Sequence, residues 1–382
     1  MDKAPTPGFT VLTDGDVKAL IGSLDSEHVS SIAEHLKTAF VAYSVGQESK
    51  YQLHRSGLQR PDGRSTLFMP ASSSTGVSIK ILNVPEPQSC TPLRGALVLC
   101  DSEGRCTGII NSEEFTGFRT ALGAMLLFQA RRIVKHIVMF GAGKQAYWHL
   151  RLALVLRSSD IRSITIYDPC ETRTRELIDQ LQEFSRTSGL NIIGNVVFNI
   201  LEGSTTSELQ LRTQASLQQA DVIFCATPSK RPLFPAEWVL GDQGYRKTPY
   251  ISAIGSYKLD MGELDPRLLQ SFATTRAGAY HPTRGDNVVN GLVIIDSREA
   301  CALEAGEIVQ SQLPETNLVE MGEMVDVERN GSDAVKNSLQ TWLHTGPIIY
   351  KSVGLGIMDL AIGQALINLA REAGIGTRLD EF

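Results

Sequence analysis

The sequence predicts an α/β protein in which a doubly wound parallel sheet is joined to a discontinuous α+β domain. Its 382 residues exceed what one small core needs, so two domains are expected. Up to about residue 110, short alternating or apolar runs separated by turn residues are typical of a mixed sheet. From residue 135 onward, apolar strands alternate with helical stretches, and this alternation favours a parallel sheet covered by helices on both faces.

The first part of the chain is expected to combine helices with a mixed sheet. Residues 26–46 carry apolar side chains at helical spacing and predict an amphipathic helix. Residues 112–130 predict a second helix, because Ser112 is a suitable N-cap and two glutamates follow in the first turn. The segment DSEG (101–104) predicts a hairpin turn. Strands are expected at 65–69, 77–84, 95–100 and 107–110.

The later part is expected to alternate strands with helices. Helices are predicted at 145–157 and 171–186. A long apolar helix, entered through glycines, is predicted within KSVGLGIMDLAIGQALINLAREAG (351–374). Strands are expected at 136–140, 163–167, near 192–197, 221–226, 249–254 and 292–296.

We expect the last helix to pack on the first domain, which makes that domain discontinuous. The expected division is 1–120 with 335–382 for the first, discontinuous domain, and 121–334 for the second domain.

Composition excludes several classes of partner. The 36 basic and 42 acidic residues give a net charge of −6 without a long block of either sign, so neither nucleic acid nor an anionic membrane is expected as a partner. The six cysteines show no CxxC and no cysteine–histidine spacing, so no metal site is expected. No run reaches roughly 18 apolar residues and no secretory leader is apparent, so a cytoplasmic location is expected.

A glycine-rich loop directly follows the apolar strand ending at Phe140 and opens a predicted helix. In such a loop the first glycine permits a tight turn and the second lets the backbone approach a pyrophosphate, while the small third residue allows helix and strand to pack closely. This order of strand, loop and helix predicts a Rossmann-type dinucleotide site. The loop residues are Gly141, Ala142, Gly143, Lys144, Gln145 and Ala146.

An acidic residue after the next strand supports the same interpretation. Asp168 follows SITIY and is placed to accept hydrogen bonds from the adenosine ribose. A carboxylate there repels a 2′-phosphate and favours NAD, but Arg173 and Arg175 lie just beyond it and keep NADP open as the alternative. Thr227 follows a later strand, where it marks either the ligand-facing edge of the sheet or an ordinary turn.

Several segments together resemble the ornithine cyclodeaminase/μ-crystallin family, in family order from about residue 55 to 360. The resemblance implies a homodimer whose first domain binds substrate and whose second domain binds NAD(P). It also implies an oxidoreductase acting on the C–N bond of amino-acid-like or cyclic imino-acid substrates. The segments are VSIKI (77–81), RTA (119–121), GAGKQA (141–146), ADVIFCATPS (220–229), AIGSYKLDMGELDP (253–266), VIIDSREACALEAGE (293–307) and KSVG (351–354).

The resemblance also implies roles for individual residues. Arg55 and Arg119 match the arginines that hold the substrate carboxylate, a task suited to a planar guanidinium. Lys80 matches the substrate lysine, and on a mostly apolar strand its pKa is expected to fall enough for proton exchange with the substrate nitrogen. Cofactor contacts are expected from Ser256, Ser352 and Gly354; a helix-entry role for the last two stays open.

The sequence departs from the cyclodeaminases where they carry an aspartate that acts on the amine. Tyr257 stands there, and a phenol that titrates near pH 10 is a poor base at neutral pH. Asp260 is a possible replacement, and Leu67 occupies the place of a second family carboxylate. The leading hypothesis is therefore an imino-acid or ketimine reductase, or an amino-acid dehydrogenase. The alternatives are a cyclodeaminase with a rearranged base and a non-catalytic, μ-crystallin-like binder of small ligands.

Overall fold

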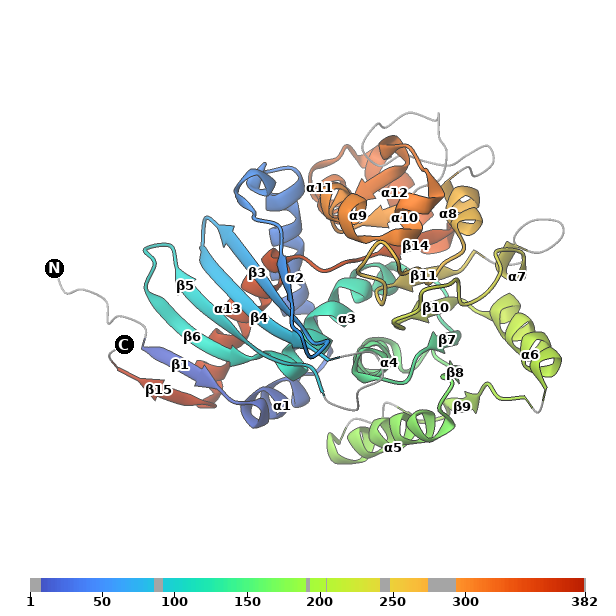
Figure 1. Ribbon diagram of the computed structural model, residues 1–382, viewed down its shortest axis with the longest axis horizontal. Helices are drawn as coiled ribbons and strands as arrows, with labels where there is room; N and C mark the ends of the chain where they lie inside the picture. Colours follow the sequence, from blue (N-terminus) through green and yellow to red (C-terminus); the bar gives the residue numbers. More distant parts are fainter. Residues whose placement is uncertain are drawn as a thin grey trace. The chain divides into compact units, whose positions relative to one another are not determined.

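The computed structural model describes residues 8–85, 92–189, 193–203, 205–240, 248–273 and 293–380. The chain forms two compact units, residues 1–119 with 355–382 and residues 120–354 (Figure 1). The second boundary differs from the expected one. Residues 335–354, expected in the first domain, lie in the second unit because strand β14 (Ile348–Lys351) pairs there with two other strands.

The first unit is built on a seven-stranded sheet, sheet A, in the order β15-β1-β6-β5-β4-β3-β2. Neighbouring strands are antiparallel except for β1 and β6, which are parallel. Its strands are β1 (Phe9–Leu12), β2 (Ser56–Gln59), β3 (Ser65–Ser73), β4 (Gly76–Val84), β5 (Arg94–Asp101), β6 (Cys106–Asn111) and β15 (Thr377–Leu379). Its helices are α1 (Asp14–Gly22), α2 (Ser26–Ser44), the short 3-10 helix η1 (Glu48–Tyr51) and α13 (Gly356–Ala373).

Helix α13 packs on one face of sheet A, beside α2. Two glycines bring its backbone close to the strands, since a Cβ at Gly356 would lie 2.4 Å from the carbonyl oxygen of Pro70. A Cβ at Gly363 would lie 2.7 Å from the Leu97 side chain. Strand β4 alternates buried and exposed residues, so every second side chain of β4 points away from the covered face.

The second unit contains an eight-stranded sheet, sheet B, in which all adjacent pairs are parallel. The strand order is β13-β12-β14-β11-β10-β7-β8-β9, so the direction of winding reverses between β7 and β10. This doubly wound sheet confirms the predicted α/β class. Its strands are β7 (His136–Phe140), β8 (Ser163–Tyr167), β9 (Val197–Ile200), β10 (Val222–Cys225), β11 (Tyr250–Ala253), β12 (Val293–Ile295), β13 (Leu318–Glu320) and β14.

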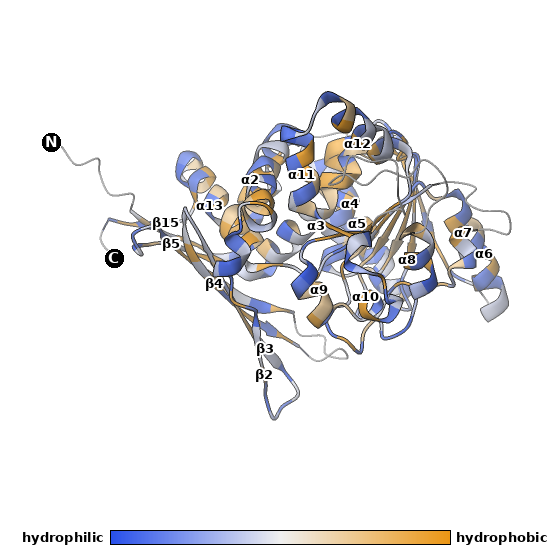
Figure 2. Ribbon diagram, turned by 90° about the horizontal axis from the view of Figure 1, so that it is seen from above, coloured by the Kyte–Doolittle hydropathy of each residue, from blue (hydrophilic) through white to orange (hydrophobic). Residues whose placement is uncertain are grey.

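The central strands of sheet B are buried along their whole length, as expected when helices cover both faces. In Figure 2 these strands are largely orange, whereas the helices around them show both colours. The helices are α4 (Lys144–Arg157), α5 (Glu171–Thr187), α6 (Thr206–Gln219), α7 (Glu237–Leu240), α8 (Pro266–Ala273), α9 (Arg298–Glu304), α10 (Gly306–Ser311), η2 (Glu315–Asn317), α11 (Met321–Asn330) and α12 (Asp333–Thr345).

Helix α3 (Ser112–Ala130) spans the boundary between the units and is buried from residue 115 to 128. Such a helix is apolar on every side and belongs to a protein core. None of the helices within the described residues combines the length and apolar character needed to cross a membrane.

The structure corrects two expected elements. Strand β9 begins at Val197, later than expected, and residues 190–192 lie outside the described part. Lys351 ends strand β14 and does not begin a helix; α13 starts five residues later, at Gly356. A four-residue apolar strand next to an apolar helix carries no periodicity of its own, so the two segments looked like one helix.

His149 on α4 predicts a stability that depends on pH. It is 1% exposed, its Nδ1 donates to the carbonyl of Gln145, and burial lowers the pKa of His149 to about 4. Above pH 6.5 the imidazole is neutral in both folded and unfolded chains. Between pH 6.5 and 4 only the unfolded chain takes up the proton, so stability falls. We expect the free energy of unfolding to drop by about 2 kcal/mol from pH 7 to pH 5 through this residue.

Urea unfolding at the two pH values measures this drop. The variant His149→Leu is expected to lose that share of the acid sensitivity, and an unchanged pH dependence in the variant would contradict the prediction.

Candidate functional site

The glycine loop forms a tight turn after β7. Gly141 has φ +104°, a conformation that favours glycine, and a Cβ there would lie 2.7 Å from the carbonyl oxygen of Ala226. Its amide donates to the carbonyl oxygen of Tyr167 at 2.8 Å. The turn therefore brings the ends of β7, β8 and β10 together at the reversal point of the sheet, where ligands bind in open α/β folds.

The loop leads into an uncapped helix N-terminus. Gly143 is the N-cap of α4 and no side chain caps the helix there. A Cβ at Gly143 would meet no atom within 4 Å, so among the described residues nothing in the protein demands glycine at this position. Lys144 is exposed, Ala142 and Gln145 are half-buried, and Ala146 is buried. The helix dipole and the backbone amides of this N-terminus, which no side chain caps, make this end suitable for a phosphate.

Asp168 lies directly beside this loop. Its Oδ2 accepts the amide of Ala142 at 3.1 Å, and its Oδ1 accepts the amide of Cys170 at 2.8 Å. Arg173 donates to the same Oδ1 at 2.7 Å, and the arginine side chain is 57% exposed. The structure thus places at one point both the carboxylate that favours NAD and an arginine suited to a 2′-phosphate. Arg175 pairs instead with Glu171.

The loops after the other central strands are tied by buried carboxylates that the sequence interpretation did not assign. Glu263, fully buried, accepts both the amide and the hydroxyl of Thr227 at 2.6 and 2.9 Å. It also accepts the amide of Gly255 at 2.6 Å. Burial raises the pKa of Glu263, while Lys351 and the N–H donors act in the opposite direction. This carboxylate therefore joins the loop after β10 to the loop after β11.

Ser256 and Ser352 are held in the same way. The hydroxyl of Ser256 donates to Glu307 at 2.6 Å, and Lys351 Nζ donates to the Ser256 carbonyl at 2.7 Å. The hydroxyl of Ser352 donates to Asp296 Oδ2 at 2.8 Å. All of these side chains are buried. The hydrogen bonds above show that both serine hydroxyls already have acceptors within the protein.

Gly354 also contacts this network. Its amide donates to Asp296 Oδ2 at 2.7 Å, and its φ of +84° explains the glycine. The expected residues Thr227, Ser256, Ser352 and Gly354 thus follow three neighbouring strands of sheet B at their carboxyl ends. In the sequence these carboxylates stand in the segments ELD, AGE and IID, but the segments do not indicate which loop groups the carboxylates bind.

The expected substrate cations lie in the first unit. Lys80 on β4 is fully buried and its Nζ donates to Asp359 Oδ1 at 2.8 Å. Arg119 on α3 is 4% exposed and its Nε lies 2.9 Å from the same oxygen. Burial lowers the pKa of Lys80 to about 7, with Arg119 and Arg55 acting in the same direction and Asp359 opposing them. A buried lysine of this kind exchanges protons near neutral pH.

Asp359 is the residue of this cluster that the sequence interpretation missed. It lies three residues after Gly356 and four before Gly363, on the side of α13 that these glycines hold against sheet A. Its only sequence signal is an acid within an apolar helix. Arg55, half-buried ahead of β2, is close enough for its charge to act on Lys80. Leu67 on β3 is half-buried and, as an apolar side chain, supplies no carboxylate at that position.

Tyr257 and Asp260 lie together in the loop after β11. Tyr257 is half-buried, with the ammonium of Lys258 5.6 Å from its ring centre. Asp260 is exposed and pairs with Lys230 at 2.7 Å, a hydrogen bond that lowers the pKa of Asp260. A general base near neutral pH needs a raised pKa, so Asp260 has the wrong environment to replace the missing aspartate.

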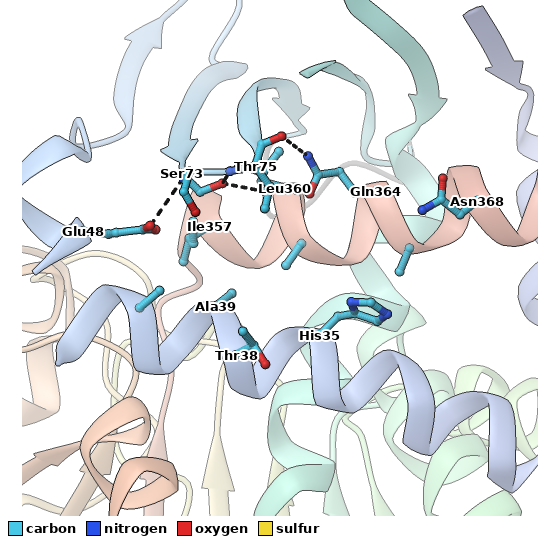
Figure 3. A pocket seen from close by; sticks show the side chains of 14 residues that line it. His35, Thr38, Ala39, Glu48, Ser73, Thr75, Ile357, Leu360, Gln364 and Asn368 are labelled. Carbon is cyan, nitrogen blue, oxygen red and sulfur yellow. Dashed lines mark hydrogen bonds between the residues drawn. The ribbon is translucent and has the colours of Figure 1, made fainter. Parts of the chain in front are cut away.

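A separate groove of about 340 Å³ lies between α2 and α13 (Figure 3). Its lining includes His35 and Thr38 from α2, Gln364 from α13 and Thr75 from the turn between β3 and β4. None of the expected site residues lines it. In the described ranges, histidine, cysteine and acidic side chains form no cluster of three or more suited to a metal ion.

The strand order and the glycine turn define a Rossmann-type α/β class, and comparisons with known proteins agree with it. No model of a known protein family matches the chain. It is 24% identical to the uncharacterized yeast protein YGL159W of Saccharomyces cerevisiae, over 94% of this chain and 97% of the relative. A Δ1-pyrroline-2-carboxylate reductase of Bacillus thuringiensis is 22% identical over 83% and 85%. An uncharacterized cyclodeaminase of Dictyostelium discoideum is 26% identical over 74% and 72%.

Solved structures share the fold. The Δ1-pyrroline-2-carboxylate reductase of Thermococcus litoralis, in complex with NADH and L-proline, has a TM-score of 0.71 at 18% identity, covering 97% of this chain and all 100% of that one. An archaeal alanine dehydrogenase dimer with bound NAD has a TM-score of 0.69 at 18% identity, covering 98% and 99%. The relatives' names bear out the resemblance to the ornithine cyclodeaminase/μ-crystallin family, and the structures confirm the fold class.

Substitution by alanine is expected to lower stability at one glycine of the loop and dinucleotide affinity at the other. Gly141→Ala strains the backbone and forces a Cβ against Ala226, so we expect a loss of about 1–3 kcal/mol in stability. Gly143→Ala meets no protein atom, so its melting temperature is expected to stay near that of the unchanged protein. Its Cβ instead stands where a pyrophosphate would approach, so dinucleotide affinity is expected to fall about tenfold or more.

Thermal unfolding and fluorescence titration with NADH separate the two effects. Equal melting temperatures for the two variants, or unchanged NADH binding by Gly143→Ala, would contradict this interpretation of the loop.

Proposed function

We propose that this chain is an NAD(H)-dependent oxidoreductase that reduces the C=N bond of an α-imino or cyclic ketimine acid, or oxidises the corresponding amino acid. The observation that carries the proposal is the buried Lys80, whose Nζ donates to Asp359 and whose pKa is lowered to about 7 by burial and by the charges of Arg119 and Arg55. A proton donor next to carboxylate-binding cations is what reduction of an imino acid requires. Relatives named Δ1-pyrroline-2-carboxylate reductase support the substrate class.

The second unit is proposed to bind the dinucleotide. The open N-terminus of α4 would hold the pyrophosphate and Asp168 the adenosine ribose, with Arg173 leaving NADP as the alternative. The loops carrying Thr227, Ser256, Ser352 and Gly354 would line the nicotinamide side. Bound NADH would supply the hydride. Structures with NADH and NAD among those of like fold support the choice of cofactor.

The first unit is proposed to bind the substrate. Arg55 and Arg119 would orient its carboxylate, and Lys80 would give a proton to the nitrogen as the C=N bond is reduced. Tyr257 would contribute a hydrogen bond and no base. We also propose a cytoplasmic location, in keeping with the free thiols of the cysteines within the described residues.

An assay with purified protein tests the function. NADH oxidation at 340 nm with Δ1-pyrroline-2-carboxylate, and with a panel of other cyclic imino acids, is the expected result. Ammonia release from ornithine or lysine without net NADH production would favour a cyclodeaminase. NADH binding without turnover of any compound in the panel would favour a small-ligand binder.

Lys80 predicts the pH dependence of this activity. Because the proton donor must be protonated, kcat/KM for reduction is expected to be constant in acid and to fall as pH rises through about 7, the pKa of Lys80. Lys80→Met is expected to lower kcat by about 10²–10⁴-fold while NADH binding stays intact. Lys18→Met is the control, since Lys18 is an exposed lysine that pairs with Asp14 at 2.7 Å. Equal activity of the two variants would remove Lys80 from the mechanism.

The uncovered face of sheet A supports a homodimer. Val77, Ile79 and Ile81 alternate along β4 and are 41%, 36% and 37% exposed, which gives an apolar stripe on that face. Contiguous apolar surface of this kind marks interaction sites, and a second copy is the commonest partner. The archaeal alanine dehydrogenase of like fold is described as a dimer.

The stripe predicts the effect of a charge on assembly. Ile79→Asp places a carboxylate in the proposed interface, where its desolvation is costly, so the protein is expected to become monomeric at micromolar concentration. Leu211→Asp on α6 is the control, because Leu211 is 68% exposed on the other unit. Light scattering after size exclusion gives the mass. A dimer that survives Ile79→Asp would place the interface elsewhere.

A further inference from the structure

Asp359 holds the position that decides the charge of Lys80. Its side chain is fully buried, and its Oδ1 lies 2.8 Å from Lys80 Nζ and 2.9 Å from Arg119 Nε. Oδ2 of the same carboxylate is also buried and has no hydrogen-bond partner among the described residues. A buried carboxylate normally satisfies both oxygens, so a half-satisfied one is a costly arrangement that needs a reason.

Helix α13 packs on sheet A in a way that places this carboxylate against the strands. Gly356 and Gly363 allow the helix backbone to approach β3 and β5, and Asp359 lies between them on the same side. Lys80 points to this covered face, because its neighbours Ile79 and Ile81 are the exposed residues of β4. The ammonium and the carboxylate thus meet inside the core and away from bulk water.

The charges around Lys80 act in opposite directions. Arg119 on α3 and Arg55 ahead of β2 repel the ammonium, and burial adds to their effect. Asp359 on α13 is the carboxylate that opposes them, through both its charge and its hydrogen bond. Without it, burial and the two arginine charges would lower the pKa of Lys80 still further.

We propose that Asp359 is a positioning residue for the reaction: its carboxylate orients Lys80 Nζ and keeps the amine protonated, so that it has a proton to give. The proposal rests on the proposed role of Lys80, but it concerns a property of the protein alone.

The test measures the titration of Lys80 directly, so it does not need turnover. Protein labelled with ¹³C at lysine Cε is titrated by NMR, and the Lys80 signal is identified by its absence in Lys80→Met. In the unchanged protein the midpoint is expected near 7. In Asp359→Asn, a variant of the same size, it is expected to fall by about 1–3 pH units. A midpoint that stays in place overturns the proposal.

Two further variants separate positioning from folding. Asp14→Asn removes a half-buried carboxylate that pairs with the exposed Lys18 at 2.7 Å, and it should leave the Lys80 midpoint unchanged. Arg119→Gln removes a repelling cation and should move the midpoint upward, which keeps the charge argument testable if Asp359→Asn does not fold. No upward shift in Arg119→Gln overturns it as well.

Activity measurements distinguish this inference from the proposed function. In an active enzyme, Asp359→Asn should move the alkaline limb of kcat/KM to lower pH by the same amount as the NMR midpoint. If no imino acid is reduced but the midpoint still shifts, the inference holds and the proposed function fails. If reduction occurs and neither limb nor midpoint moves, Asp359 is only structural and the inference fails.

Discussion

One carboxylate oxygen, Oδ1 of Asp359, contacts and compensates two buried cations, and the organisation of the first unit depends on that contact. An ionised aspartate inside an apolar helix is tolerated only when its charge is compensated close by. The compensation comes from Lys80 on β4 and Arg119 on α3, so three elements distant in the chain must meet at one point. The glycines of α13 make this contact possible, because a larger side chain at either position would clash with the strands. Apolar burial alone would have permitted many positions of this helix on the sheet.

The second unit uses the opposite arrangement at the carboxyl edge of sheet B. There the acceptors are three buried carboxylates, Glu263, Glu307 and Asp296, and most of the donors are amides and hydroxyls of the loops. The loop after β10 is therefore held by an acid from the loop after β11, and the segment after β14 by Asp296, an acid distant in the chain. Because the hydroxyls of Thr227, Ser256 and Ser352 are already donated, we infer that these loops offer a ligand chiefly backbone groups and shape. At the same edge the start of α4, where no side chain caps the helix, likewise presents backbone amides.

Local signals explain which features the sequence predicts well. The bounds expected for α3 agree with the structure, and its first turn is acidic as expected. The predicted N-cap is wrong, because Ser112 is the first helical residue and its hydroxyl makes no hydrogen bond within the described residues, whereas the side chain of Asn111 accepts the amide of Glu113. The glycine turn depends on six adjacent residues. Asp359 carries no such signal, because its partner Lys80 lies 279 residues away and an acid in an apolar helix usually marks a solvent-facing position. The sequence predicts no strand at 348–350 and places Lys351 at the entry to a helix, because tertiary pairing, and not local pattern, decides the form of β14.

The balance of charge around Lys80 also bears on which reaction the first unit suits. The groups that act most strongly on it within the described residues are two arginines and one carboxylate, so the protonated cluster has an excess of positive charge. A substrate with one carboxylate and a neutral imine restores that balance and raises the affinity of Lys80 for its proton. Ornithine or lysine would bring a further ammonium group next to these cations, and Leu67 of the same unit carries no carboxylate to receive it. The electrostatics thus favour an imino acid over a diamino acid, independently of any relative's name.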